Sequence, residues 1–207
     1  MQPPPTYLNV LSLSPYGKAI PYTGNATCEA NKYSNCGFKN LKAQPELIHT
    51  VPELVADSAL RSLVQSLNAD SSSFFSVGCF SDPVQIDQGH RYKGYVDFSW
   101  NCKKCVQDAI NYFSLFFHFE QFLRDQDFQQ AVKLDWVVEQ AQFSDVNIHG
   151  FCCAIFINTP VCASVEQAYT VWQRSLKMLE AFLSNIHRPS SSTIYSSATA
   201  PVNVLTT

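Results

Sequence analysis

The sequence predicts an α+β fold with the element order α-ββα-ββα, in which a short helix precedes two ββα units. We expect the strands to form one antiparallel sheet that packs on long helices in a two-layer arrangement. Two patterns carry this prediction. Apolar and polar residues alternate with a period of two from Arg91 to Trp100, as in a strand with one buried face, and apolar residues recur at helical spacing from Ser164 to Ile186.

Composition divides the chain into three parts. Residues 1–49 are rich in Pro, Asn, Tyr and Gly and show no sustained period, so we expect an irregular amino-terminal arm. Residues 50–188 are expected to form a single α+β domain. Residues 189–207 are rich in Ser, Thr and Pro and carry no charge, which predicts a disordered tail.

The domain is expected to open with a short helix. Thr50-Val51-Pro52-Glu53 has the form of a capping box with proline in the first turn. Apolar residues then recur at helical spacing as far as Asn68. We therefore expect a helix that begins after Thr50 and ends near Asn68.

In the first unit, the apolar run Phe74 to Phe80 predicts one strand, and the alternating run that ends at Trp100 predicts a second. Asn101 is then predicted to cap a long helix that ends at about Arg124. Apolar residues cover most of this helix, so we expect it to be central or to lie at an interface. Phe116 and Phe119 would then lie at that interface.

The second unit repeats this order. Residues 132–138 alternate, residues 151–157 form an apolar strand, and Ser164 begins a capping box at the start of the last helix. The stretches 73–124 and 132–187 can thus be interpreted as an internal repeat. The element order also resembles that of secretion chaperones of the type III class and related small α+β binding proteins, a likeness of fold alone.

Charge and composition exclude two kinds of partner. Only 15% of the residues are charged, the net charge is −3, and the 14 Lys and Arg are scattered, so we expect no nucleic-acid partner. Tyr112 to Leu123 is too short to span a bilayer, and Met1 to Pro15 lacks the basic start of a secretory signal. We therefore expect a cytoplasmic protein without a membrane partner. Its eight cysteines are then expected to be free thiols or metal ligands.

Cys102-Lys103-Lys104-Cys105 is the strongest chemical motif. A thiolate at this predicted helix start would face the positive end of the helix dipole and two ammonium groups, which lower the pKa of a thiol. The run Tyr95 to Cys105 resembles the active-site strand and helix start of thioredoxin, and His149 to Cys152 falls where that family has its cis-proline segment. The chain has Asn101 where the family has tryptophan, and Cys152 where it has proline. The resemblance implies a thiol redox role for Cys102 and Cys105.

The same pair could instead bind zinc. Cys28 and Cys36 of the arm, together with Cys102 and Cys105, could form a tetrahedral four-thiolate zinc site that pins the arm to the domain. The alternative is that these four residues are unpaired thiols. Zinc is the only cofactor for which we recognise ligands.

Asp97 and Asp135 are the carboxylates that stand out in the predicted strands. They occupy the polar faces beside Lys93 and Lys133, which predicts solvated cross-strand ion pairs rather than an acid and base pair. We recognise no catalytic constellation among the histidines and cysteines, and no glycine-rich phosphate loop.

The sequence therefore favours a non-enzymatic protein-interaction module whose partner is another protein or a second copy of the chain. The alternative is a cysteine-centred protein with structural zinc or a thiol redox role at Cys102 and Cys105. An enzyme whose residues converge only in three dimensions stays open.

Overall fold

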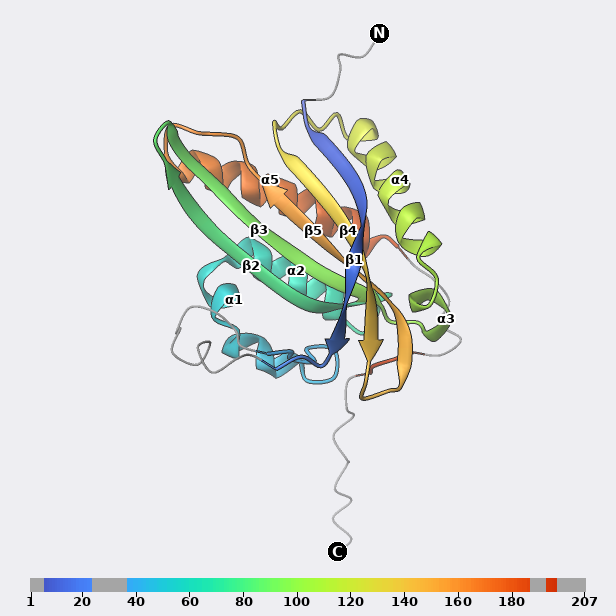
Figure 1. Cartoon of the computed structure of the whole chain (residues 1–207). Coiled ribbons are helices and arrows are strands. Elements are labelled where there is room, and N and C mark those ends of the chain that lie inside the picture. The colour runs from blue at the N-terminus through green and yellow to red at the C-terminus, as the bar shows by residue number, and fades with distance from the viewer. Residues whose placement is uncertain (1–5, 24–36, 187–192, 197–207) are drawn as a thin grey trace, which may run out of the picture.

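The computed structural model describes residues 6–23, 37–186 and 193–196 (Figure 1). These residues form an α+β structure around one five-stranded sheet with the strand order β1-β4-β5-β3-β2. The bounds of the strands are β1 (Leu8–Ile20), β2 (Phe74–Ile86), β3 (Gly89–Trp100), β4 (Lys133–Phe143) and β5 (Ile148–Asn158). The α+β class is confirmed.

The sheet is mixed, so the prediction of an antiparallel sheet is wrong in one respect. β2 pairs with β3, β3 with β5 and β5 with β4, all antiparallel, but β1 pairs with β4 in parallel. β1 lies within the stretch expected to be irregular. Two hairpins each precede a long helix, as predicted, but their origin by duplication is not confirmed.

A register shift between Leu13 and Gly17 interrupts the pairing of β1 with β4. Pro15 lies inside this shift and has no backbone N–H to donate, and a proline in a bulge is typical of an edge strand. Gly17 resumes the pairing opposite Gln140, where an added Cβ would lie 3.2 Å from the Gln140 carbonyl oxygen. Because Lys18 follows directly after this shift, the shift sets the direction in which the Lys18 side chain projects from β1.

The helical segment before β2 begins earlier than predicted and is divided. A 3-10 helix, Pro45–Thr50, is followed by α1 (Pro52–Ala56) and α2 (Ser58–Asn68). Thr50 does not cap a helix. Asp57 is the N-cap of α2, because its Oδ1 accepts hydrogen bonds from the backbone N–H groups of Ala59 and Leu60, each at 3.1 Å.

The long helix predicted to start at Asn101 is also divided, into α3 (Lys103–Val106) and α4 (Ile110–Asp125). Ala109 is the N-cap of α4, and the Asp108 side chain accepts a hydrogen bond from the N–H of Ile110 at 2.9 Å in the break between the two helices. Cys102, not Asn101, is the N-cap of α3. The Asn101 side chain instead binds the backbone of Ile194 and Tyr195 through both its oxygen and its nitrogen.

The last helix, α5 (Val165–Ser184), begins where it was predicted, with the Ser164 side chain accepting a hydrogen bond from the N–H of Gln167. α2, α4 and α5 lie over one face of the sheet (Figure 1). The largest side chains of the core are buried between this face and the helices: Trp100, Trp136, Trp172, Phe98 and Phe119. We call this the helix-covered face.

Side chains alternate across each strand, so the neighbours of these residues project from the opposite face. There Asp97 lies opposite Ala154, and Glu139 lies opposite Cys152. No helix in the described part of the chain is long and apolar enough to cross a membrane.

Of the predicted tail, residues 193–196 are described and the others from 189 onward lie outside the described residues. Tyr195 is buried, its ring lies 4.9 Å from that of Phe75, and its hydroxyl donates to Asp145 at 2.8 Å. Tyr195 is therefore anchored in the core, while Thr193 and Ser196 beside it are exposed.

Candidate functional site

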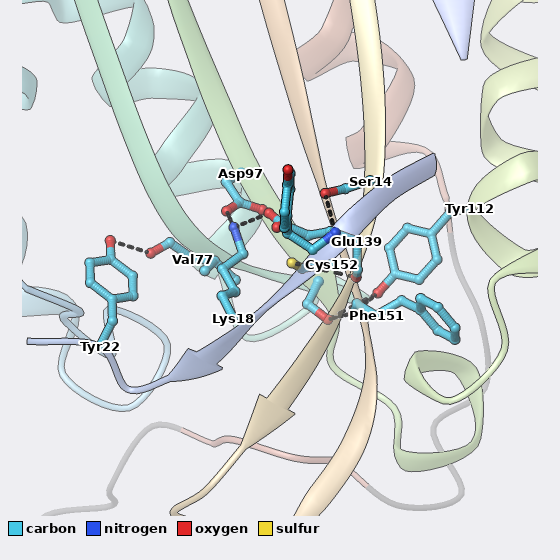
Figure 2. A network of polar contacts seen from close by, with 11 residues as sticks. Ser14, Lys18, Tyr22, Val77, Asp97, Tyr112, Glu139, Phe151 and Cys152 are labelled. Carbon is cyan, nitrogen blue, oxygen red and sulfur yellow. Dashed lines mark hydrogen bonds and ion pairs between the residues drawn. The ribbon is translucent and has the colours of Figure 1, made fainter. Parts of the chain in front are cut away.

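An ion-pair cluster lies on the face of the sheet opposite the helices. The Lys18 ammonium contacts the carboxylates of both Asp97 and Glu139 (Figure 2). β1 supplies Lys18, β3 Asp97 and β4 Glu139, so three strands that are distant in sequence meet here. The Cys152 thiol of β5 is the fourth member, and its sulfur and one oxygen of each carboxylate all lie within 4.8 Å of one another.

Asp97 is the most deeply buried charged member of the cluster. Its side chain is 4% exposed, against 18% for Glu139 and 26% for Lys18. Burial raises the pKa of Asp97 to about 6, although the neighbouring Lys18 opposes this shift. The carboxyl group is therefore ionised at neutral pH and takes up a proton in mild acid.

Lys18 and Cys152 are held in their protonated forms. Burial acts to lower the pKa of Lys18, but the charge of Asp97 and the hydrogen bonds to Asp97 and Glu139 outweigh it, so this pKa lies above its ordinary value. Burial and the charge of Asp97 raise the pKa of Cys152 well above that of a free thiol. At neutral pH Lys18 is thus a cation beside the ionised Asp97, and Cys152 is a neutral thiol.

One oxygen of this cluster has no hydrogen bond. Lys18 binds Oδ2 of Asp97, whereas the buried Oδ1 has no hydrogen-bond partner among the described residues. A weak hydrogen bond from the Cys152 thiol to the Asp97 carboxylate acts to lower the pKa of Asp97, but no N–H or O–H group of the described residues donates to Oδ1. A buried carboxylate oxygen without a donor is unfavourable and rare in folded proteins.

Asp97 lies at the wall of a cavity of about 510 Å³, which is within the size range of small-molecule sites. β1 and the residue Tyr22 after it, α1, β2, β3, β4 and β5 all contribute to the lining. The charged side chains of the lining are Lys18, Lys39, Glu53, Asp97 and Glu139, and the aromatic ones are Tyr22, Phe80, Tyr95 and Phe156. Tyr22 closes one side, where its hydroxyl donates to the carbonyl of Val77 at 3.1 Å (Figure 2).

Asp97, Glu139 and Cys152 offer three donor atoms at metal-binding separation. However, the Lys18 ammonium contacts both carboxylates and supplies the positive charge that a metal ion would bring. A metal ion would have to displace Lys18 and deprotonate a thiol whose pKa is strongly raised. The cluster is better described as a carboxylate pair neutralised by lysine.

The predicted zinc ligands are only partly described. Cys28 and Cys36 lie outside the described residues. Cys102 and Cys105 are buried at the start of α3 and are joined to each other by a disulfide, contrary to the expectation of free thiols. In this form their sulfurs are not thiolate ligands; the four-cysteine zinc site and the redox role of the pair stay predictions.

Three further cysteines, Cys79, Cys152 and Cys153, lie in strands of the sheet. Cys152 and Cys153 are fully buried, but Cys79 lines the cavity. Burial, with the charges of Glu53 and Asp57, holds the pKa of the Cys79 thiol above its ordinary value. None of these three thiols is therefore activated as a nucleophile.

Sequence reasoning missed the ion-pair cluster. Asp135 pairs with Lys133 at 2.8 Å, but within β4 and not across strands as predicted, and Asp97 is buried against Lys18 instead of lying in solvent beside Lys93. Asp97 differs because the Lys18 side chain and the segment around α1 lie against this part of the sheet. One signal could have found β1: polar residues alternate with Leu11 and Leu13 in Leu11-Ser12-Leu13-Ser14, the period of a strand.

A scan against protein-family models and searches of curated proteins and of solved structures gave no match.

Proposed function

We propose that this chain is a non-enzymatic binding protein whose ligand occupies the cavity beside Lys18, Asp97 and Glu139. The observation that carries the proposal is the buried Asp97 Oδ1, which lacks a hydrogen-bond donor and belongs to a residue that lines a cavity of about 510 Å³. A ligand with a donor group would satisfy this oxygen and remove the cost of its burial. A buried oxygen without a hydrogen-bond donor is a feature of a recognition site rather than of an optimised core.

The protonation states of the site favour binding over catalysis. Lys18 is held by two carboxylates with its pKa above the ordinary value, so it cannot act as a nucleophile or base at neutral pH. The pKa values of Cys79 and Cys152 are raised, which leaves both as neutral thiols. The site thus offers charge and hydrogen bonds to a ligand but no activated nucleophile.

A cavity-filling substitution tests this proposal. Ala154 is buried and lines the cavity, so Ala154→Leu places extra atoms in it, while Ala163→Leu adds the same atoms at an exposed position. We would screen small fragments by ligand-observed NMR against the wild type and both variants. The proposal expects fragments that bind the wild type and Ala163→Leu but lose affinity about tenfold or more for Ala154→Leu. Fragments that bind all three proteins alike, or no binding at all, would contradict it.

A second candidate function is self-association through α4, and a different observation favours it. Ile110 and Phe117 lie on α4 with 63% and 65% of their surfaces exposed. The interface residues expected from the sequence were Phe116 and Phe119, but Phe119 is fully buried. Neither Ile110 nor Phe117 carries a charge, so the two side chains can meet the same pair of a second copy without a charge-complementary partner.

The oligomeric state tests this second candidate. Phe117→Glu places a charge on this exposed part of α4, and Ala163→Glu places the same charge at an exposed position outside α4. Sedimentation equilibrium should show a dimer for the wild type and for Ala163→Glu, and a monomer for Phe117→Glu. A wild-type monomer at high protein concentration would remove this candidate.

A further inference from the structure

The cavity has more acidic than basic side chains. Three carboxylates line it, Glu53, Asp97 and Glu139, against two lysines. Lys39 is held at the exposed rim, where its ammonium donates to the carbonyl and the hydroxyl of Thr50 at 2.6 and 2.8 Å. Lys18 is then the only cation beside the Asp97 and Glu139 pair among the described residues, which leaves a surplus of negative charge at this wall.

The pKa values of other groups that line the cavity are shifted in the direction that nearby negative charge would cause. Burial raises the pKa of Tyr22 and of Tyr95, and the charge of Asp97 raises both further. Burial also raises the pKa of Cys79, and the charges of Glu53 and Asp57 add to it. Lys18 opposes the shift at both tyrosines, but burial and the nearby carboxylates outweigh it, so a further anion in the cavity is disfavoured.

Aromatic rings lie in the same lining. The ring of Tyr95 lies 5.3 Å from that of Phe156 and 6.4 Å from that of Phe80, so the three rings form a continuous group along β2, β3 and β5. Tyr95 is two residues from Asp97 on the same face of β3. Faces of aromatic rings attract cations, and a carboxylate beside such rings is a recurring way to recognise an ammonium group.

Resting on the proposed function, we propose that the ligand of this cavity is a protonated amine, whose ammonium donates a hydrogen bond to Asp97 Oδ1 and whose apolar body packs on Tyr95 and Phe156. Oδ1 requires an N–H or O–H donor, which a primary ammonium has and a fully methylated one lacks, and the surplus of negative charge favours the ammonium over a neutral hydroxyl. The source of the ammonium is a free amine or a lysine side chain of another protein. Both offer the same group to Asp97.

Three probes of one shape test the chemical class. These are 2-phenylethylamine, its N,N,N-trimethyl derivative and the neutral 2-phenylethanol, each titrated by isothermal calorimetry or NMR shift mapping at about pH 7.5. The primary amine should bind at least about tenfold more tightly than either of the others, with shifts at Tyr95 and Phe156. A lysine-containing peptide with a blocked amino terminus forms the second arm. Tighter binding of the peptide assigns a protein partner, and tighter binding of the free amine assigns a small molecule.

Asp97→Asn removes the charge of the recognition site, while Asp135→Asn removes a carboxylate that pairs with Lys133 at the surface. Affinity for the primary amine should fall about tenfold or more in Asp97→Asn and stay unchanged in Asp135→Asn. Equal affinity of Asp97→Asn and the wild type would overturn the inference.

The pH dependence of the wild type gives a test that needs no variant. Asp97 is protonated below its pKa of about 6, whereas the probe amine stays protonated, so binding should weaken as the pH falls from about 7.5 to about 5. The other titratable groups that face Asp97 are Lys18, Tyr22, Tyr95, Glu139 and Cys152. The lysine, the two tyrosines and the cysteine of this set all have pKa values above their ordinary values, so they stay protonated throughout this range.

The possible outcomes distinguish a failure of the amine assignment from a failure of the proposed binding function. If neutral or anionic fragments bind in the cavity and are lost in Ala154→Leu, the binding function stands and the amine assignment fails. If 2-phenylethylamine binds but its affinity is the same at both pH values, the assignment to Asp97 fails. If nothing binds, both fail.

Discussion

The indole Nε1 of Trp172 donates a hydrogen bond to Oδ2 of Asp57 over 2.7 Å. The other oxygen of the same carboxylate caps α2 and accepts from the hydroxyl of Tyr169 at 3.1 Å. Asp57 and Trp172 are both buried. One carboxylate therefore joins the start of α2 to two side chains of α5 and fixes how these helices meet.

Asp57→Ala should lower the free energy of unfolding by about 3 kcal/mol, because it removes the helix cap and leaves a buried indole N–H without an acceptor. Ser164→Ala removes only the cap of α5 at a less buried site and should cost about 1 kcal/mol. Urea unfolding followed by tryptophan fluorescence measures both. Equal losses for the two variants would show that Asp57 acts as a cap alone.

Lys18→Met should destabilise the fold by about 2 to 4 kcal/mol, since it leaves Asp97 and Glu139 close together without a counter-charge. The control is Lys133→Met, which removes a surface partner of Asp135 and should cost less than about 1 kcal/mol. The same urea experiment measures the pair. A Lys18→Met protein as stable as the control would mean that the cluster is solvated.

Asp97→Asn should change how stability depends on pH. The ordinary pKa of 3.8 applies to the unfolded chain and a value of about 6 to the folded one, so between these values the folded protein keeps a proton that the unfolded chain has released. The stability of the wild type therefore falls as the pH rises through this window. Asn does not titrate, so the variant should gain on the order of 3 kcal/mol relative to the wild type between about pH 3.5 and about pH 7. Parallel pH profiles of the two proteins would refute the raised pKa.

Gly94→Ala should unfold the protein or cost several kcal/mol, because an added Cβ would overlap with the carbonyl oxygen of Phe80 and with the ring of Trp172. At Gly78 the nearest atom to an added Cβ is the hydroxyl of Tyr22, at 3.1 Å, which a rotation of the side chain can relieve. Gly78→Ala is therefore the matched control, with an expected loss of about 1 kcal/mol or less. Thermal unfolding by circular dichroism compares them, and a well-folded Gly94→Ala would contradict the packing of β3 against α5.

Asn101→Ala should release residues 193–196 from the core, since the Asn101 side chain makes three hydrogen bonds to the backbone of Ile194 and Tyr195. Amide hydrogen exchange at Ile194 and Tyr195 should become much faster, while exchange in β3 and β5 stays slow. Tyr195→Phe, which loses only the hydrogen bonds to Asp145, serves as the control and should keep most of the protection. Unchanged exchange in Asn101→Ala would show that packing of Tyr195 alone holds the segment.

The elements that could be predicted from the sequence are those whose signals all lie within the element itself. The two hairpins and the helix that begins after Ser164 were found because alternation, helical spacing and a capping serine are all local signals. The division at Asp108 and the capping role of Asp57 were missed, because a short polar side chain can cap a helix in several registers and the sequence does not choose among them.

The candidate site could not be predicted in the same way, because it depends on a contact between distant segments. Asp97 shows the polar alternation of a solvated strand residue, and it is buried only because Lys18 and the segment around α1 lie over it. Cys102 and Cys105 were expected to be free thiols or metal ligands, whereas the structure joins them as a disulfide.

The parallel pairing of β1 with β4 also sets the order in which the protein can be made. β1 leaves the ribosome before its partner Lys133–Phe143, which follows more than 110 residues later, a delay of roughly ten seconds at ordinary rates of synthesis. During this delay β1 lacks its partner strand, and the proline in its centre limits its pairing with other nascent chains. The cluster of Lys18, Asp97 and Glu139 can therefore assemble only after β4 has been made and β1 has docked on it.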